Sequence, residues 1–266
     1  MIDRAPGRAP ADNAAGLAFI LGFARTGTTL LGQILAALPD VALLEESEIL
    51  TATAGTFVRD SDGFERLAGL TAPEIGGYRQ AFWQHAQQLG ADLKDRVVVE
   101  QTALNTVYMP VISRIFPDAA VVFVIRDPRD VVFSCFRRKF EPTPFTLEFH
   151  SLESTAKVYD RTMRLAEIAR GMMVSGPIDI RYEDLLADFD GETRRLCAGL
   201  GVRWSETMRD FHVLSASRNL TTASAPQIRR GLTRDSVGAW RSYREHMAPV
   251  LPLLAPWVER FGYPPD

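Results

Sequence analysis

Residues 17–31 read LAFILGFARTGTTLL and join the two patterns that decide the fold. The first six residues form a short apolar run that ends in glycine, which predicts a strand buried on both faces of a parallel sheet. From Thr28 onward, leucine and isoleucine recur at helical spacing, and Pro39 lies just past the end of that pattern. The stretch therefore predicts a strand, a glycine-rich loop and a helix in direct succession.

Three later segments repeat this order of strand and helix. The strands are expected at VVVE (97–100), AVVFVI (120–125) and PIDIR (177–181), and helical patterns follow each of them, the longest over about 146–173. A last helix, broken near Pro249 and Pro252, is expected near the C-terminus, and residues 215–239 read as an irregular loop. Alternating strands and helices predict an α/β fold: one domain over 17–266, with a P-loop-like parallel sheet flanked by helices on both faces.

Composition excludes several classes of partner. The chain of 266 residues has 30 basic and 33 acidic residues, a formal charge of −3, and no block of like charges, so we expect no nucleic-acid partner. The polar first 16 residues are expected to be disordered, and no stretch reaches 18 apolar residues, so we expect no membrane partner. Cys135 and Cys197 form no disulfide framework or metal pattern, which favours the cytoplasm.

The loop GFARTGTT, residues 22–29, has the form of an anion cradle. The first amides of a helix lack intrahelical acceptors, and the helix dipole favours negative charge at the same point. Thr28 stands where a nucleotide-binding P-loop has lysine, and the cation, Arg25, comes three residues earlier. The alternative is a tight turn whose threonines cap the helix. The strand and the full set of residues favour a functional loop, and the missing lysine disfavours ordinary ATP or GTP hydrolysis.

The segment RDPRDVVFSCFRRKF, residues 126–140, supplies a second candidate anion site. Arg126 follows the most apolar strand, and open α/β sheets bind ligands at the carboxyl ends of their strands. Ser134 and Arg138 follow on the next helix, with Arg129 and Arg137 as further cations. The alternative is a solvated basic helix face. Together with the first loop, the segment predicts two phosphate sites on neighbouring strands, as a nucleotide phosphorylated at two places requires.

These two segments resemble the 5′-phosphosulfate and 3′-phosphate loops of sulfotransferases that use 3′-phosphoadenosine 5′-phosphosulfate (PAPS). The resemblance is closest to tyrosylprotein sulfotransferases and to bacterial enzymes of that type that are often fused to tetratricopeptide repeats. It extends through LPDVALLEESE, EQTALN, FPDAAVVFVIRDPRD, IRYEDLLAD, GVRWSE, SVGAWRSY and ERFGYP, in that order along most of the chain. It implies an enzyme that transfers the sulfonate of PAPS to a hydroxyl-bearing acceptor, with no metal.

The resemblance also implies residue roles. Donor contacts fall to Arg25, Thr26, Gly27, Thr28, Thr29, Arg126, Ser134, Arg138, Tyr182 and Arg230, and catalytic roles to Arg25, Glu46, Ser224 and Gln101. Arg25 would stabilise the charge that develops on the leaving phosphate oxygen. Glu46 would accept the proton of the acceptor hydroxyl, because a carboxyl near the apolar end of a sheet has a raised pKa. The alternative for Glu46 is an exposed acidic turn shared with Glu45 and Glu48.

Two positions depart from the family pattern. Gln101 stands where the family usually has a lysine that stabilises the transferring sulfonate, and Ala239 stands where a basic residue commonly precedes a tryptophan. Arg229, Arg230 or Arg241 are candidates to compensate for Ala239. Other sulfotransferases use a histidine as the base. His150, at the start of the long helix, is the candidate for that role here, although an ordinary surface role is favoured.

Two rival functions stay open: the missing P-loop lysine counts against the first, and Gln101 and Ala239 favour the second. One is an ATP-dependent kinase of the P-loop type, and the other is a nucleotide-binding module without catalysis. For the enzyme, the lack of a Golgi-type anchor favours a small-molecule or glycan acceptor over a tyrosine in a secreted protein, although a tyrosine-like phenol stays open. A homodimer is compatible with the sequence, which contains no signal for or against it.

Overall fold

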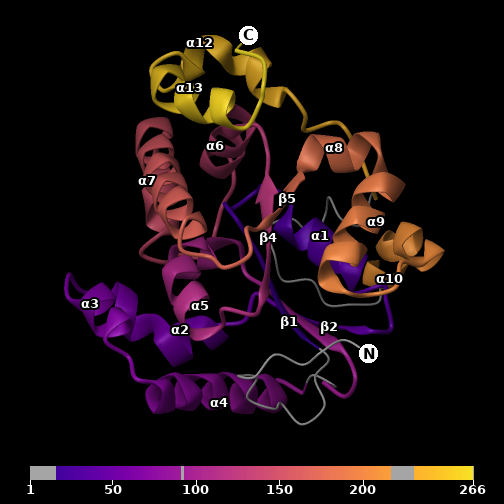
Figure 1. Cartoon of the computed structure of the whole chain (residues 1–266). Coiled ribbons are helices and arrows are strands. Elements are labelled where there is room, and N and C mark those ends of the chain that lie inside the picture. The colour runs from indigo at the N-terminus through magenta and orange to yellow at the C-terminus, as the bar shows by residue number, and fades with distance from the viewer. Residues whose placement is uncertain (1–15, 91–92, 217–230, 266) are drawn as a thin grey trace.

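The computed structural model describes residues 16–90, 93–216 and 231–265 (Figure 1). Its sheet has the order β2-β3-β1-β4-β5, and every neighbouring pair is parallel. The strands are β1 (Gly16–Gly22), β2 (Val41–Glu45), β3 (Val97–Gln101), β4 (Ala120–Ile125) and β5 (Ile178–Arg181). Because β1 lies between β3 and β4, the loops that follow these three strands emerge side by side at one edge of the sheet.

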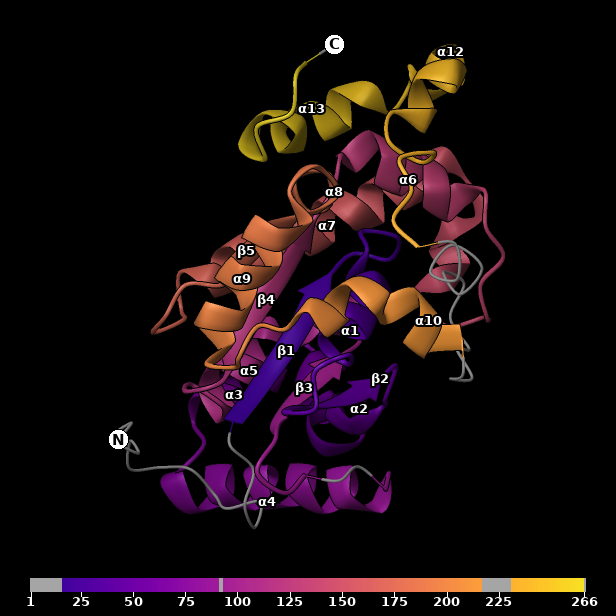
Figure 2. The ribbon, with the colours of Figure 1, turned by 90° about the vertical axis from the view of Figure 1, so that its right-hand side faces the viewer.

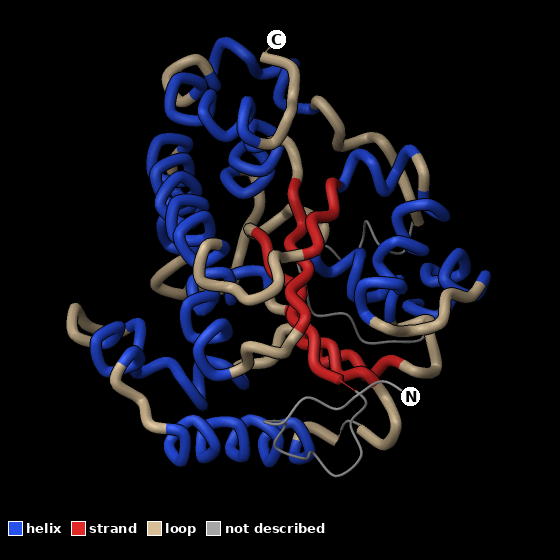
Figure 3. Tube along the Cα trace, in the orientation of Figure 1, coloured by secondary structure: helices blue, strands red, loops and turns tan. Residues whose placement is uncertain are grey.

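Helices and short 3₁₀ turns connect the strands (Figure 3). The helices are α1 (Thr28–Leu35), α2 (Ile49–Ala54), α3 (Gly63–Ala68), α4 (Ala72–Gln88), α5 (Met109–Ile115), α6 (Pro128–Phe136), α7 (Leu152–Arg170), α8 (Tyr182–Ala187), α9 (Phe189–Leu200), α10 (Phe211–Ala216), α12 (Arg244–Met247) and α13 (Leu251–Arg260). The 3₁₀ turns are η1 (Gly55–Val58), η2 (Ala103–Tyr108), η3 (Thr146–His150), η4 (Glu206–Asp210) and η5 (Ala239–Tyr243).

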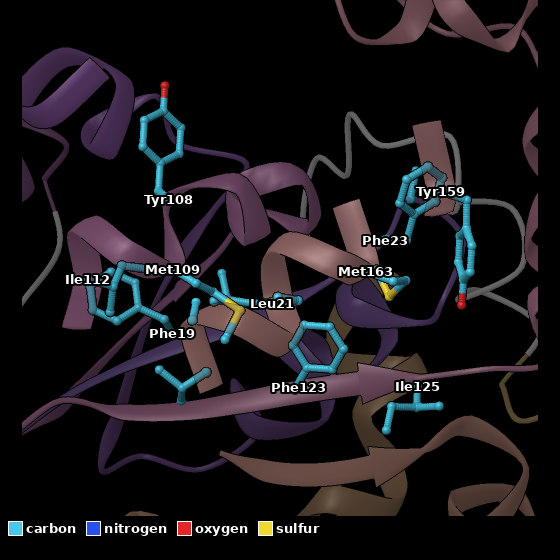
Figure 4. Packing of buried hydrophobic residues seen from close by; sticks show 14 of the residues in the cluster. Phe19, Leu21, Phe23, Tyr108, Met109, Ile112, Phe123, Ile125, Tyr159 and Met163 are labelled. Carbon is cyan, nitrogen blue, oxygen red and sulfur yellow. The ribbon is translucent and has the colours of Figure 1, made fainter. Parts of the chain in front are cut away.

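Alternate residues of β1 face two separate hydrophobic layers, as strand geometry requires. Ala18 and Ile20 pack in the layer formed with α1, α9 and α10. Phe19 and Leu21 point to the other face, toward α5 and α7. Figure 4 shows this second layer, with side chains of β1 and β4 among those of α5 and α7. The strand is therefore buried on both sides, as its apolar sequence predicted.

The two ends of the sheet carry different elements. In both views α4 lies below the amino ends of the strands, and α6, α12 and α13 lie above their carboxyl ends (Figures 1 and 2). The carboxyl edge is therefore where the chain brings together the loop after β1 and the start of α6. Within the described ranges, no helix combines the length and the apolar composition needed to cross a membrane.

The α/β fold with a parallel sheet and helices on both faces is confirmed, and four of the five strands were expected. The fifth, β2 (VALLE), was missed because its apolar residues lead directly into Glu45, Glu46 and Glu48, and the segment reads as an acidic turn. The expected helix at 146–173 begins as η3 and continues as α7. The predicted disordered segment lies outside the described residues except for Gly16, which begins β1. Most of the expected loop at 215–239 also lies outside them.

The packing around β1 gives a first prediction. Phe19 is fully buried, and its ring lies 6.0 Å from that of Phe82 and 5.7 Å from that of Phe116. Phe19→Ala should lower the free energy of unfolding by about 3–5 kcal/mol because the cavity collapses only in part. Phe64→Ala, at a position 43% exposed, is the matched control and should change it by less than about 0.5 kcal/mol. Urea denaturation measures both, and equal losses would contradict this assignment of the core.

Candidate functional site

The last residue of β1, Gly22, lies opposite Val124 of β4, and its backbone hydrogen bonds go to a side chain. The Gly22 amide donates to the Thr106 hydroxyl at 2.9 Å, and that hydroxyl donates to the Gly22 carbonyl at 2.5 Å. A Cβ on Gly22 would lie 2.8 Å from the Val124 carbonyl oxygen and 2.7 Å from the Thr26 hydroxyl. Glycine is therefore required here by the close approach of β4 and of the loop itself.

The loop after Gly22 turns tightly into α1. The amide and the hydroxyl of Thr26 both donate to the Phe23 carbonyl, at 3.2 and 2.8 Å, so Thr26 shapes the turn. Gly27 caps the helix with φ +109°, a conformation that favours glycine. Thr28 and Thr29 are buried in the first turn. The first amides of α1 have no intrahelical acceptor, so this end of the helix is suited to an anion.

Arg25 joins this loop to α6. Its side chain is 92% buried, and its Nε donates to the Ser134 hydroxyl at 3.1 Å. The pKa of Arg25 is lowered to about 10, mainly by burial; Cys135 opposes the shift, and the nearby Arg138 and Arg126 contribute to it. The guanidinium is still protonated at neutral pH. The two segments that the sequence assigned to separate phosphate sites are thus in direct contact.

Arg126 leaves the end of β4 and crosses the same space. Its Nη1 donates to the Arg25 carbonyl at 3.0 Å and its Nη2 to the Ser236 carbonyl at 2.5 Å. The guanidinium lies 4.9 Å from the centre of the Tyr182 ring. Its Nε is buried and has no hydrogen-bond partner among the described residues. An unpaired buried donor of a charged group calls for an acceptor, and a bound anion would supply one.

The other polar residues after β4 hold the structure together. Asp127 caps α6 by accepting the Arg129 amide at 2.9 Å, and it also pairs with the Arg129 guanidinium. That guanidinium donates to the carbonyls of Pro264 and Pro265 and lies over the Trp240 ring. Arg129 therefore anchors the C-terminal segment, and the expectation that it adds a cation to the ligand site is wrong.

Asp130 anchors a second segment over the site. Its carboxylate accepts the Gly238 amide at 2.6 Å and the Trp240 amide at 3.0 Å. Burial raises the pKa of Asp130, and the positive charge of Arg126 opposes the rise. The Ser236 carbonyl accepts a hydrogen bond from Arg126. Residues 236–240 are therefore bonded to both Arg126 and Asp130. Nothing in the sequence pattern indicated these backbone contacts.

These elements enclose a cavity of about 480 Å³. It is lined by Arg25, Gly27, Leu30, Arg126, Asp130, Phe133, Ser134, Arg137, Arg138, Tyr182, Gly231, Thr233, Asp235, Ser236 and Ala239. Four arginines and two aspartates make the lining net positive in a chain whose formal charge is −3. Ala239, where the resemblance implies a basic residue, also lines the cavity. Arg137 and Arg138, from the end of α6, supply cations there, whereas Arg241 lies over Trp240.

Glu46 and Gln101 lie together at the ends of β2 and β3. The Glu46 amide donates to the Gln101 carbonyl at 2.8 Å, and the Gln101 side-chain amide donates to the Glu46 carboxylate at 3.2 Å. The Glu46 residue is solvent-accessible, yet the protein atoms packed around its carboxyl group raise the pKa of that group, and the hydrogen bond from Gln101 opposes the rise. Gln101 is fully buried. A raised pKa suits a carboxylate that accepts a proton.

The comparison with known proteins now decides the family. The model of the sulfotransferase family matches residues 18–206, which is most of the chain. This chain belongs to the sulfotransferase family. A putative protein-tyrosine sulfotransferase of Caenorhabditis briggsae is 23% identical over 93% of this chain and 89% of its own length. Protein-tyrosine sulfotransferase 2 of Gallus gallus is 26% identical over 94% of this chain and 70% of its own length.

One further relative is much longer than this sulfotransferase, and several solved structures resemble it in fold at low sequence identity. A protein of Aquifex aeolicus is 23% identical, and the chain spans about a third (32%) of that relative's length. Among solved structures, the sulfotransferase domain of the Synechococcus PCC 7002 olefin synthase has a TM-score of 0.61 at 20% identity, covering 95% of this chain and 96% of its own. A mouse sulfotransferase complexed with PAP has a TM-score of 0.55 at 18% identity, covering 92% and 85%. These structures share the fold.

Backbone strain coincides with two candidate catalytic residues of this sulfotransferase. Among the described residues, three that are not glycine have positive φ: Arg25 at 71°, Glu46 at 46° and Asp95 at 55°. Such conformations cost of order 1–3 kcal/mol each and persist where the surroundings over-determine them. Arg25 and Glu46 are held in this conformation by the contacts described above, whereas Asp95 lies at an exposed position.

The remaining candidates divide into two groups. Ser224, Arg229 and Arg230 lie outside the described residues. His150 is exposed, and its Nδ1 is bonded to the Leu147 carbonyl at 2.9 Å within its own turn, which fits the ordinary surface role. Tyr182 lines the cavity beside Gly27, where a Cβ on Gly27 would lie 2.8 Å from its ring.

The two bonds of Asp130 give a prediction for the sulfotransferase scaffold. Asp130→Asn leaves one of the Gly238 and Trp240 amides facing an NH₂ group, so the free energy of unfolding should fall by about 1–3 kcal/mol. Asp118→Asn, at an exposed position, is the matched control and should leave it within about 0.5 kcal/mol. Urea denaturation of both variants is the measurement, and a loss for Asp130→Asn no larger than that of the control would rule out the anchoring role.

Proposed function

We propose that this sulfotransferase uses PAPS as its sulfonate donor and binds it in the cavity at the carboxyl edge of the sheet. The observation that carries the proposal is the buried Arg126 Nε, which has no partner among the described residues and belongs to a net positive lining. The free amides at the start of α1 add donors for a second anionic group. Two sets of donors in one cavity of about 480 Å³ fit a nucleotide with phosphate groups at both ends.

Each part of the donor then has a set of residues. The amides of Gly27, Thr28 and Thr29 would hold the 5′-phosphate at the start of α1. Arg126, Ser134 and Arg138 would hold the 3′-phosphate, and Tyr182 would lie beside the nucleotide. The mouse relative in fold is complexed with PAP, which supports this assignment. A 3′-phosphate is what distinguishes this donor from ATP, so the site predicts a preference for PAP over ATP.

The catalytic roles follow from charge and position. PAPS supplies an activated sulfonate; as the acceptor oxygen bonds to sulfur, the bond from sulfur to the phosphate oxygen breaks. Arg25, buried and protonated, would stabilise the negative charge on that leaving oxygen. Glu46 would accept the hydroxyl proton. Gln101 is neutral and does not replace the family's lysine as a cation; its hydrogen bond at 3.2 Å orients the Glu46 carboxylate instead.

The proposed acceptor of this sulfotransferase carries a hydroxyl group. The names of the Caenorhabditis and Gallus relatives support a tyrosine-like phenol. The small molecule or glycan expected from the sequence has no support beyond that reasoning. A transfer assay with labelled PAPS should therefore offer a tyrosine-containing peptide, a small phenol and an oligosaccharide in parallel. The cytoplasmic location and a homodimer likewise stay predictions.

Gly27 provides a test of the donor site that does not depend on the acceptor. Gly27→Ala, at φ 109°, places a Cβ 2.8 Å from the Tyr182 ring, whereas Gly201→Ala, also at a positive φ (67°), meets nothing within 4 Å. Gly201→Ala should cost about 1 kcal/mol of stability from backbone strain, and Gly27→Ala should cost more because the Tyr182 ring must also move. Gly27→Ala alone should reduce the PAP-induced rise in Tm, by a loss of affinity of roughly tenfold or more.

The same thermal-shift experiment separates the rival functions. PAP should raise the Tm of the wild type without Mg²⁺, and ATP should raise it much less because it lacks a 3′-phosphate. Stabilisation by ATP that needs Mg²⁺, with no response to PAP, would favour the kinase and overturn the assignment of PAPS. Stabilisation by PAP with no transfer to any of the three acceptors would favour the module without catalysis.

Glu46 provides the test of catalysis. Glu46→Gln removes the proton acceptor and should lower kcat by about 10²–10⁴-fold. Its PAP-induced rise in Tm should equal that of the wild type, because Glu46 is not among the cavity-lining residues. Glu48→Gln, two residues on and also exposed, is the matched control and should keep full activity. Wild-type turnover by Glu46→Gln would show that another group accepts the proton.

A further inference from the structure

Glu100 is a buried carboxyl group that the proposed chemistry does not use. It is the residue before Gln101 in β3, it is fully buried, and it points to the opposite face of the sheet. Three donors converge on its Oε1: the Ser47 hydroxyl at 3.3 Å, the Thr102 hydroxyl at 2.7 Å and the Asn105 side-chain amide at 3.1 Å. Its Oε2 is buried and has no partner among the described residues.

This arrangement favours a neutral carboxylic acid. All three donors are uncharged, and they contact one oxygen only, so an ionised Glu100 would bury half of its charge without compensation. Burial raises the pKa of Glu100 to about 8, and the nearby Glu46 adds to the rise, while the hydrogen bonds from Thr102, Asn105 and Ser47 oppose it. Because Oε1 accepts three hydrogen bonds, the proton belongs on Oε2.

The donors link Glu100 to the segment that carries Glu46. Ser47 directly follows Glu46, and its hydroxyl reaches Glu100. The Thr102 hydroxyl contacts the Ser47 carbonyl at 3.3 Å as well as Glu100. On the other side of Glu46, its own amide is bonded to the Gln101 carbonyl. The hydrogen bonds of Ser47 on one side and of the Glu46 amide on the other therefore hold the left-handed backbone of Glu46 (φ 46°) in place.

We propose that neutral Glu100 is a positioning residue that holds Ser47, and through it the strained backbone of Glu46, in the geometry needed for proton transfer. Glu46 is the charged group that contributes to the pKa of Glu100. Ionisation of Glu100 would therefore place a second negative charge near the Glu46 carboxylate. Two ionised carboxylates this close repel each other, so the Glu46 carboxylate would be displaced from the position in which the Gln101 side-chain amide holds it, and proton transfer would slow. This inference rests on the proposed role of Glu46.

The decisive variant is Glu100→Gln, which keeps an oxygen for the three donors and is neutral at every pH. At pH 6.5 it should turn over within about twofold of the wild type, since both are neutral at position 100. Between pH 7 and pH 9 the ratio of its activity to that of the wild type should rise roughly tenfold, because a group with a pKa of about 8 is about 90% ionised at pH 9. Both enzymes are assayed with the same acceptor, so a change in the ionisation of the acceptor with pH affects both activities equally and cancels in their ratio.

Two further variants separate positioning from other effects. Glu100→Ala removes the acceptor of all three hydrogen bonds and should lower kcat at every pH, while Glu65→Gln, at an exposed position, should follow the wild-type profile. A constant ratio of Glu100→Gln to wild type from pH 7 to pH 9 would overturn the proposal. So would an inactive Glu100→Gln at pH 6.5 that keeps its PAP-induced rise in Tm, because an ionised Glu100 would then be required.

Two measurements need no turnover. The infrared C=O stretching band of a protonated carboxyl should be present at pH 7, fade near pH 8 and be absent from Glu100→Gln. The Tm of the wild type should fall as pH rises toward 8, because the folded protein keeps the Glu100 proton up to about pH 8 while the unfolded chain releases it near 4.5. The absence of both signals would refute a neutral Glu100. Full activity of Glu46→Gln would instead refute the proposed base and leave these signals intact.

Discussion

The double hydrogen bond between Gly22 and the Thr106 hydroxyl is the constraint on which the site depends. The ladder between β1 and β3 ends at Ile20, opposite Gln101, so β3 does not reach the backbone groups of Gly22. Thr106 satisfies both backbone groups of Gly22 at the point where the sheet ends. The chain then turns within a few residues into α1. That turn brings the amides of the helix to the end of β4, where Arg126 emerges.

Rigid elements hold the strained residues of the site. Arg25 and Glu46 have left-handed backbone conformations. Arg25 lies in the loop after β1, and Glu46 directly follows β2, so both are close to the ends of neighbouring strands. The Arg25 carbonyl accepts from Arg126, and the Glu46 amide donates to the Gln101 carbonyl. Each bond ties a strained residue to the adjacent strand. The cost of strain is thereby offset by contacts that also orient the two side chains, as a preorganised site requires.

The sequence predicted the class of fold and most residues at the carboxyl edge, because both depend on local patterns. Apolar runs and glycines gave the strands and the first loop, and the spacing from Arg126 to Ser134 placed both near that loop. What sequence could not give were contacts between distant segments. The bond from Arg25 to Ser134 and the anchoring of 236–240 by Asp130 join residues more than 100 positions apart. Arg129 reads as one more cation, and only the position of the C-terminus shows its carbonyl partners.

Charge is divided between the two sides of β1. The cations gather beside β4, where Arg25, Arg126, Arg137 and Arg138 line one cavity. On the side of β2 and β3, the side chains at the carboxyl ends of the two strands are neutral or acidic: Gln101, Glu46 and Glu100, which we propose to be protonated. A lysine at 101 would have to be buried completely against α1, where the Gln101 side chain now lies 3.3 Å from a Cβ built on Gly32. Glutamine avoids that cost, and no cation among the described residues depresses the pKa of Glu46. In the proposed mechanism, glutamine at position 101 thus removes a cation from the sulfonate and, by the same change, leaves the pKa of Glu46 raised, as a proton acceptor requires.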